Sequence, residues 1–209
     1  MPAAAISSLR QNEPLAQVLA LHIRRGDYAP HCRKMASFAS GYNSWNLLPS
    51  LPDVYNPPNE IKEGEDLDEF MRHCWPSIDD IVRRVRDVKR DYETQGRGQL
   101  KAVYVLTNGK RPWLDELTGS LLASGMGWER VTSSRDLVYV GLAEKLANQA
   151  ADMEIAKRSA VFIGNGASAA LHPWVGSLLT LVGQFSTMTA NILMFRLVYG
   201  MSAQTTRFW

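Results

Sequence analysis

The sequence predicts an α/β domain built on a parallel sheet with helices on its faces. Short apolar segments rich in β-branched residues alternate with longer segments of helical periodicity, and turns rich in glycine or proline separate them. The chain has 209 residues, of which 45% are hydrophobic. This is enough to bury one sizeable core, so we expect a single Rossmann-like domain over residues 1–209.

The first predicted strand is the apolar run 18–23, which ends at two adjacent arginines. Residues 28–66 follow and contain several prolines and aromatic residues. This composition predicts an irregular excursion with little regular structure. Loops of this length are usually functional or flexible, so we expect part of the excursion to border a binding site.

Helical periodicity resumes at 67–73 and continues through 78–92. There, apolar residues recur at helical spacing among interleaved acids and bases: Ile78, Ile81, Val82, Val85, Val88 and Tyr92. We expect residues 78–92 to form an amphipathic surface helix whose charged face carries i,i+4 ion pairs. The alternative is a basic patch that binds a partner.

The remaining elements alternate in the same way. A glycine-containing turn at 95–98 precedes the second strand, and Pro112 suits the first turn of the helix after it. The apolar spacing predicts a strand at 102–106, a helix from 111 or 112, a short strand at 129–132, one or two helices from 142, a strand at 160–163 and a last helix at 186–199.

Composition excludes several classes of protein. The formal net charge is +2 and the basic residues are mostly scattered, so we expect no nucleic-acid partner. Residues 1–20 lack the basic and apolar regions of a secretory signal. No apolar run reaches the ~20 residues that a membrane span needs. The compartment therefore stays unknown.

The two cysteines each follow a histidine, as His31-Cys32 and His73-Cys74. Three states are open: a disulfide closing a loop of about 42 residues, two free thiols, or a zinc site that includes both histidines. Adjacent His-Cys pairs give poor tetrahedral geometry because neighbouring side chains diverge, which argues against zinc.

The segment His22-Ile-Arg24-Arg25-Gly-Asp27 places two guanidinium groups at the end of the first strand, where open α/β sheets bind ligands. Arginine matches phosphate oxygens with a planar fork of donors, so a pyrophosphate is the expected ligand. Side chains alternate across a strand, so His22 and Arg24 should share one face and Arg25 the other. The alternatives are an Arg24–Asp27 ion pair and a core-edge role for His22.

Three segments in chain order resemble the signatures of the GDP-fucose protein O-fucosyltransferase family: His22-x-Arg24-x-x-Asp27, the strand 103–108, and residues 152–166. That family has two Rossmann-like lobes in a GT-B arrangement. This chain resembles the C-terminal, donor-binding lobe without its N-terminal partner lobe. The resemblance implies inverting, metal-independent transfer of fucose from GDP-fucose to a protein or glycan hydroxyl, with no cofactor.

The resemblance also implies roles for individual residues. Arg24 would be the catalytic phosphate clamp, and Asp152 would accept hydrogen bonds from guanine unless it is a solvent-facing helical residue. The donor-binding residues implied are His22, Arg24, Arg25, Asp27, Thr107, Asn108, Asp152, Gly164, Asn165, Gly166, Ser186 and Thr187. No general base can be assigned, because the family places the acceptor between the lobes or on the absent one.

Residues 167–184 depart from the family pattern, in which the glycine turn leads almost directly into the Ser186-Thr187 pair. We expect this segment to be a translated intron or gene-model error rather than a functional lid; another alignment uses Ser168 as the helix cap. Two rivals to a transferase follow: a catalytically silent nucleotide-sugar-binding lobe, or an incomplete gene product acting as an interaction module. An upstream segment would imply the ER or Golgi lumen, or a membrane anchor.

Overall fold

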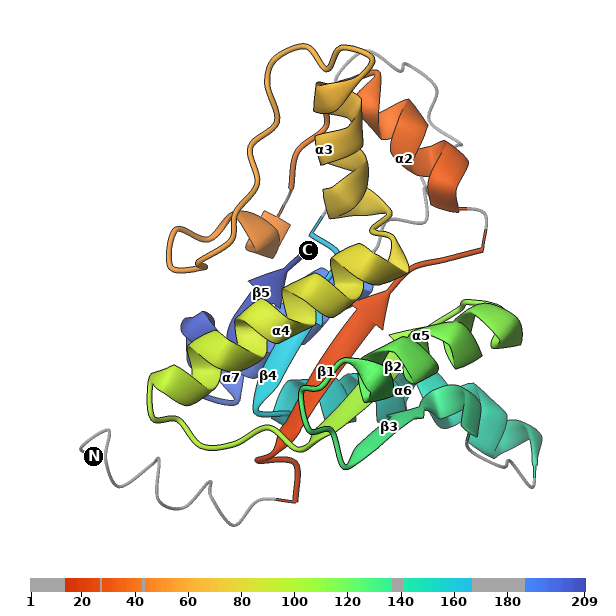
Figure 1. The fold of residues 1–209 in the computed structure, drawn as a ribbon, viewed down its shortest axis with the longest axis vertical. Helices are drawn as coiled ribbons and strands as arrows, with labels where there is room; N and C mark the ends of the chain where they lie inside the picture. The colour runs from red at the N-terminus through yellow and green to blue at the C-terminus, as the bar shows by residue number, and fades with distance from the viewer. Residues whose placement is uncertain (1–13, 27, 43, 137–140, 167–186) are drawn as a thin grey trace.

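The computed structural model describes residues 14–26, 28–42, 44–136, 141–166 and 187–209. Within these residues, five parallel strands form one sheet in the order β3-β2-β1-β4-β5 (Figure 1). The strands are β1 (Val18–Ile23), β2 (Ala102–Thr107), β3 (Arg130–Ser133), β4 (Val161–Gly164) and β5 (Thr206–Phe208). This confirms the predicted α/β class and the parallel sheet, and the architecture is consistent with a Rossmann-like fold.

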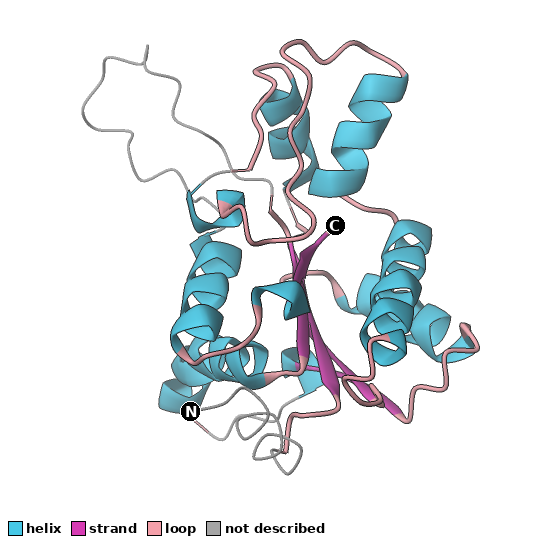
Figure 2. Cartoon of the chain, turned by 90° about the vertical axis from the view of Figure 1, so that its left-hand side faces the viewer, coloured by secondary structure: helices cyan, strands magenta, loops and turns pink. Residues whose placement is uncertain are grey.

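Helices cover both sides of the sheet, as Figure 2 shows. They are α2 (Tyr28–Ala36), α3 (Glu65–Cys74), α4 (Ile78–Thr94), α5 (Arg111–Ala123), α6 (Leu142–Arg158) and α7 (Thr187–Val198), with the short 3-10 turns η1 (Ser44–Leu47), η2 (Ser134–Asp136) and η3 (Ala203–Thr205). None of the helices in this part of the chain is long and apolar enough to cross a lipid bilayer.

Alternate side chains of β1 enter two different cores. Leu19, Leu21 and Ile23 pack into a cluster that includes the buried faces of α4 and α5. Ala20 packs into a second cluster, together with residues of α6 and α7. Both faces of the central strand are buried, which explains why β1 reads as a continuous apolar run rather than an alternating one.

Helix α4 is the predicted amphipathic surface helix. Ile81, Val85 and Val88 are buried against the sheet, as their spacing indicated. Ser77 and Asp80 form a capping box at the start of the helix, which satisfies backbone N–H groups of its first turn. Exposed i,i+3 ion pairs lie along this helix, and the pair at the predicted i,i+4 spacing, Lys89–Glu93, is less exposed.

The prediction of an irregular excursion at 28–66 is wrong in its first part, because Tyr28–Ala36 form helix α2. Figure 1 shows α2 and α3 together beyond the end of the sheet. The two helices share a core that includes Cys32 and Met35 from α2 and Phe70 from α3. Pro30 lies in the first turn of α2, where proline is tolerated, and the prolines on which the prediction rested (Pro49, Pro52, Pro57 and Pro58) all follow this helix.

Strand β5 was not predicted, and Arg196 of α7 explains how it is held. The Arg196 side chain is 0% exposed. Its guanidinium donates to the carbonyls of Ala156 and Ser159, each at 2.8 Å, where α6 ends. It also donates to the hydroxyl of Thr205, the last residue of η3, at 3.0 Å and to the hydroxyl of Thr206, the first residue of β5, at 2.9 Å. One buried cation therefore joins α6, α7 and β5, and its charge complements the helix dipole at the end of α6.

Candidate functional site

The sheet order places a topological switch point between the carboxyl ends of β1 and β4. The chain moves outward from β1 to β2 and β3, then returns to β4 on the other side of β1. Ligands of open α/β sheets bind at such a point. Because β1 ends at His22 and Ile23 and β4 ends at Gly164, the structure brings together two of the segments that the sequence singled out.

Arg25 is buried on the α5 side of the sheet, as side-chain alternation predicted. Its guanidinium lies between two indole rings, 4.4 Å from the centroid of Trp75 and 4.5 Å from that of Trp113. It also donates a hydrogen bond to the carbonyl of Pro76. Burial lowers the Arg25 pKa to about 10, so the side chain stays charged at neutral pH. These contacts give Arg25 a structural role: it fastens the α3–α4 junction to the end of β1.

Arg24 has very different surroundings. Its side chain is half-buried, and its guanidinium carbon lies 5.6 Å from the centroid of the Tyr28 ring. Its Nε is buried and has no hydrogen-bond partner among the residues that the structure describes. Helix α2 begins four residues after Arg24, so the partial positive charge of a helix N-terminus lies nearby in the chain. The alternative of an ion pair with Asp27 falls on a residue outside the described ranges.

His22 is buried between β1 and α7. Its Nδ1 lies 2.7 Å from the hydroxyl oxygen of Thr189, and its carbonyl accepts a hydrogen bond of 3.2 Å from the indole Nε1 of Trp209. Burial, aided by the positive charge of Arg24, lowers the His22 pKa to about 4. The imidazole is therefore neutral at pH 7, and Arg24 supplies the positive charge on this side of the strand end.

The lowered pKa of His22 predicts a pH-dependent stability. The folded-state pKa of about 4 lies below the unfolded value of 6.5, so the unfolded chain takes up a proton first as the pH falls. The contribution of the neutral His22 to the free energy of unfolding is therefore fully present above about pH 6.5 and is lost as the pH falls toward 4. Between pH 7.5 and 4.5 we expect the native chain to lose roughly 2–3 kcal/mol more stability than His22→Gln, which keeps a polar group but does not titrate. Urea denaturation of both chains at the two pH values measures this, and parallel losses would contradict it.

Thr107 and Asn108 tie the end of β2 to the end of β1. The Thr107 hydroxyl donates to the carbonyl of Ile23 at 2.7 Å and accepts from the Gly109 N–H at 3.0 Å. The Asn108 side-chain oxygen accepts a 2.6 Å hydrogen bond from the backbone N–H of Arg25. Both predicted donor-binding side chains therefore lie beside the site. Their hydrogen bonds hold the backbone at the end of β1.

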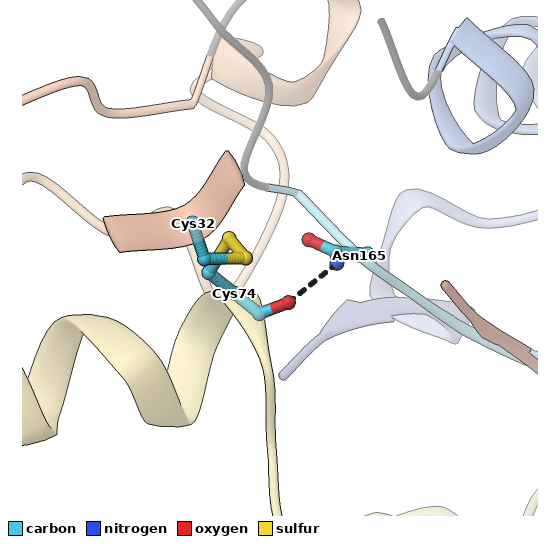
Figure 3. The surroundings of a disulfide bond; sticks show 3 residues. All are labelled: Cys32, Cys74 and Asn165. Atoms are coloured by element: carbon cyan, nitrogen blue, oxygen red, sulfur yellow. Dashed lines mark hydrogen bonds between the residues drawn. A yellow bond between two sulfur atoms is a disulfide. The ribbon is translucent and has the colours of Figure 1, made fainter. Parts of the chain in front are cut away.

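The turn Gly164-Asn165-Gly166 is tightly packed at the end of β4. A Cβ at Gly164 would lie 2.5 Å from a side-chain atom of α7, and a Cβ at Gly166 would lie 2.5 Å from the ring of Tyr42. The Asn165 amide donates to the carbonyl of Cys74 at 2.9 Å, as Figure 3 shows. Close packing therefore explains why glycine occupies positions 164 and 166. The hydrogen bond of Asn165 connects the end of β4 to the end of α3.

Asp152 lies on α6 and is buried, so the alternative of a solvent-facing residue is wrong. Its carboxylate accepts a 2.7 Å hydrogen bond from the Tyr104 hydroxyl of β2 and another from the side chain of Ser134. Burial raises the Asp152 pKa, and the two hydrogen bonds oppose the shift. Tyr104 was not predicted as a partner of Asp152, although side-chain alternation along β2 is the signal that places it on the α6 side of the strand.

Several predicted site residues cannot be placed. Asp27, Ser186 and the segment 167–184, with Ser168, lie outside the described residues. Thr187 begins α7, but its side chain also lies outside them. The predicted phosphate contacts of the Ser186-Thr187 pair therefore stay predictions.

Cys32 and Cys74 form a disulfide, with their Cα atoms 5.8 Å apart (Figure 3), in place of two free thiols or a zinc site. Throughout the described ranges, no group of three or more His, Cys, Asp or Glu side chains could hold a metal ion. The bond joins α2 to the end of α3, so it fixes the helix that begins just after Arg24.

A comparison of the chain with models of known protein families finds no match, and a comparison with curated proteins finds none either.

Proposed function

We propose that the chain binds the diphosphate of a guanine nucleotide sugar at the carboxyl ends of β1 and β4. The observation that carries this proposal is Arg24, a half-buried guanidinium whose Nε has no partner among the described residues and which lies at the switch point of the sheet. A charged donor of this kind, close in the chain to a helix N-terminus, favours a phosphate ligand.

The reaction that we propose is inverting transfer of fucose from GDP-fucose to a protein or glycan hydroxyl. When the glycosidic bond breaks, negative charge grows on the β-phosphate, and Arg24 would stabilise that charge without a metal ion. The neutral His22 beside it would add polarity without a second charge. This specific reaction rests on the family resemblance, as does the need for an N-terminal lobe.

Guanine selectivity is proposed for Asp152. A carboxylate can accept from both N1 and the exocyclic amino group of guanine, and adenine lacks that pair of donors. A carboxylate offers about four acceptor positions, so two hydrogen bonds within the protein leave acceptor capacity for a base.

The test is binding of GDP, GDP-fucose and ADP to the native chain and to Arg24→Ala, measured by calorimetry. Loss of charge-assisted hydrogen bonds to phosphate should weaken GDP binding ten- to a hundredfold. Arg86→Ala, which removes an exposed arginine of α4, is the matched control and should bind GDP like the native chain. Unchanged GDP affinity in Arg24→Ala, or equal affinity for ADP, would contradict the proposal.

A catalytically silent lobe is the second candidate. The observation that favours it is that Thr107, Asn108 and Asn165 all make hydrogen bonds within the protein. Release of fucose from GDP-fucose separates the two candidates, because a silent lobe would bind the nucleotide sugar without turnover.

A further inference from the structure

A cavity of about 880 Å³ lies beside the α3–α4 junction, and none of the residues proposed for donor binding line it. Its walls come from residues 53–55, from α3, from the start of α4 and from Trp209. The volume is within the range of roughly 300–1,000 Å³ that is typical of small-molecule sites.

One part of the cavity wall is aromatic. Tyr55 and Trp75 contribute partly exposed rings that stacking holds in place, whereas Trp209 also lines the cavity but is only 6% exposed. The Tyr55 ring stacks on the ring of His73 with centroids 3.9 Å apart, and Trp75 lies against the guanidinium of Arg25. A ligand would therefore meet an apolar surface that needs little ordering when it binds.

The polar part of the wall consists of carboxylate–guanidinium pairs. Arg72 pairs with Glu69, Arg83 with Asp80, and Arg84 with Asp53 at 2.5 Å. Each pair presents hydrogen-bond donors and acceptors side by side. A hydroxyl group both donates and accepts, so it can bind such a pair without separating it.

The charges of the lining disfavour anionic ligands. Its carboxylates, which include Asp68 and Asp87 beyond the three pairs, outnumber its arginines, so a phosphate would meet excess negative charge. A cation would be attracted by that excess but repelled by the guanidinium group of each ion pair. A neutral ligand that carries many hydroxyls meets neither repulsion and can bind the pairs themselves.

We propose that this cavity binds a neutral saccharide, with the apolar face of a sugar ring on the aromatic wall and its hydroxyls on the ion pairs. Trp209 donates to the His22 carbonyl, and Trp75 stacks on Arg25, so the cavity shares two contacts with the end of β1. The saccharide would thus lie near the donor site, as an acceptor should; this acceptor role rests on the proposed function, whereas saccharide binding does not.

Saturation-transfer NMR on the full 209-residue chain tests the proposal, with maltotriose, mannotriose and chitotriose as probes. At least one trisaccharide should receive saturation from the protein. In a separate nitrogen–proton correlation spectrum, the same trisaccharide should shift the indole N–H signal of Trp75. The Trp128 signal is the internal control, because that ring lies against Lys89 and does not line the cavity.

Arg72→Ala is the informative variant because its side chain is 46% exposed and its loss leaves no buried group unsatisfied. Because Arg72→Ala removes hydrogen-bond donors from the cavity wall, the substitution should raise the saccharide Kd by about tenfold. The control Arg86→Ala should leave the saccharide Kd unchanged. No saturation of any trisaccharide at millimolar concentration, equal affinity in Arg72→Ala, or indole shifts caused by inorganic phosphate or a lysine peptide in place of saccharide would overturn the proposal.

The nucleotide-sugar proposal and the saccharide proposal can be tested independently of each other. Arg72→Ala should keep native affinity for GDP, and Arg24→Ala should keep native affinity for the saccharide. Loss of GDP binding by the native chain would remove the nucleotide-sugar proposal and leave saccharide binding standing.

Discussion

Replacing Arg196 with alanine is expected to cost at least about 5 kcal/mol, because it leaves several buried acceptors without their donor. The carbonyls of Ala156 and Ser159 and the hydroxyls of Thr205 and Thr206 all accept from this one guanidinium. A loss of this size is comparable to the whole stability of an ordinary domain. We therefore expect Arg196→Ala to accumulate as unfolded or insoluble protein, as solubility and far-UV circular dichroism would show.

Arg196→Lys keeps the charge and should still be strongly destabilised, because one ammonium group cannot reach acceptors on three elements. Arg90→Ala on α4 is the control: Arg90 is 64% exposed and pairs with Asp87 at 3.1 Å. Exposed pairs of this kind contribute at most about 1 kcal/mol. A folded Arg196→Ala chain with a urea midpoint close to that of Arg90→Ala would show that the buried network matters little.

Breaking the disulfide has the second largest expected effect. Cys32 and Cys74 are 42 residues apart in the sequence. Closing a loop of that size restricts the unfolded chain, and its loss costs about 4 kcal/mol in the chain-entropy treatment. Urea denaturation of Cys32→Ser/Cys74→Ser should therefore show lower stability than the oxidised native chain by about that amount.

Reduction gives the control for the disulfide. A reducing agent should shift the unfolding midpoint of the native chain toward that of the double serine variant, and should not change the variant. Reducing agent that leaves the native midpoint unchanged would contradict a stabilising bond. We also expect α2 to lose more order than α6, because the bond joins α2 to α3.

The strands of the central sheet could be predicted because their sequence pattern is local. Residues 18–23 and 102–107 are apolar and β-branched, and both became buried parallel strands. Alternation also predicted that Arg25 would leave the face of His22, and the structure places Arg25 between Trp75 and Trp113. The same strand periodicity places Arg24 just after the first strand and the Gly164–Gly166 turn at the end of a later strand, whereas the sheet order that makes β1 and β4 neighbours was not predicted.

The rest depends on contacts that are distant in the sequence. Nothing near His22 indicates that Thr189, 167 positions later, holds its ring. Strand β5 has only three residues, pairs with β4 and contacts Arg196, whose position in the apolar pattern of α7 gives no sign of that role. Helix α2 was not predicted, because the prolines of residues 28–66 indicate irregular structure and the packing of α2 against α3 is distant in the sequence.

The position of β1 in the middle of the sheet has a consequence for biosynthesis. Its neighbour β4 lies about 140 residues downstream, and the Trp209 indole reaches the His22 carbonyl across 187 positions. Translation proceeds at roughly 5–20 residues per second, so the first strand waits many seconds on the ribosome before its partners emerge. We expect slow folding dominated by non-local pairing, with the apolar segment 18–23 exposed to chaperones during that interval.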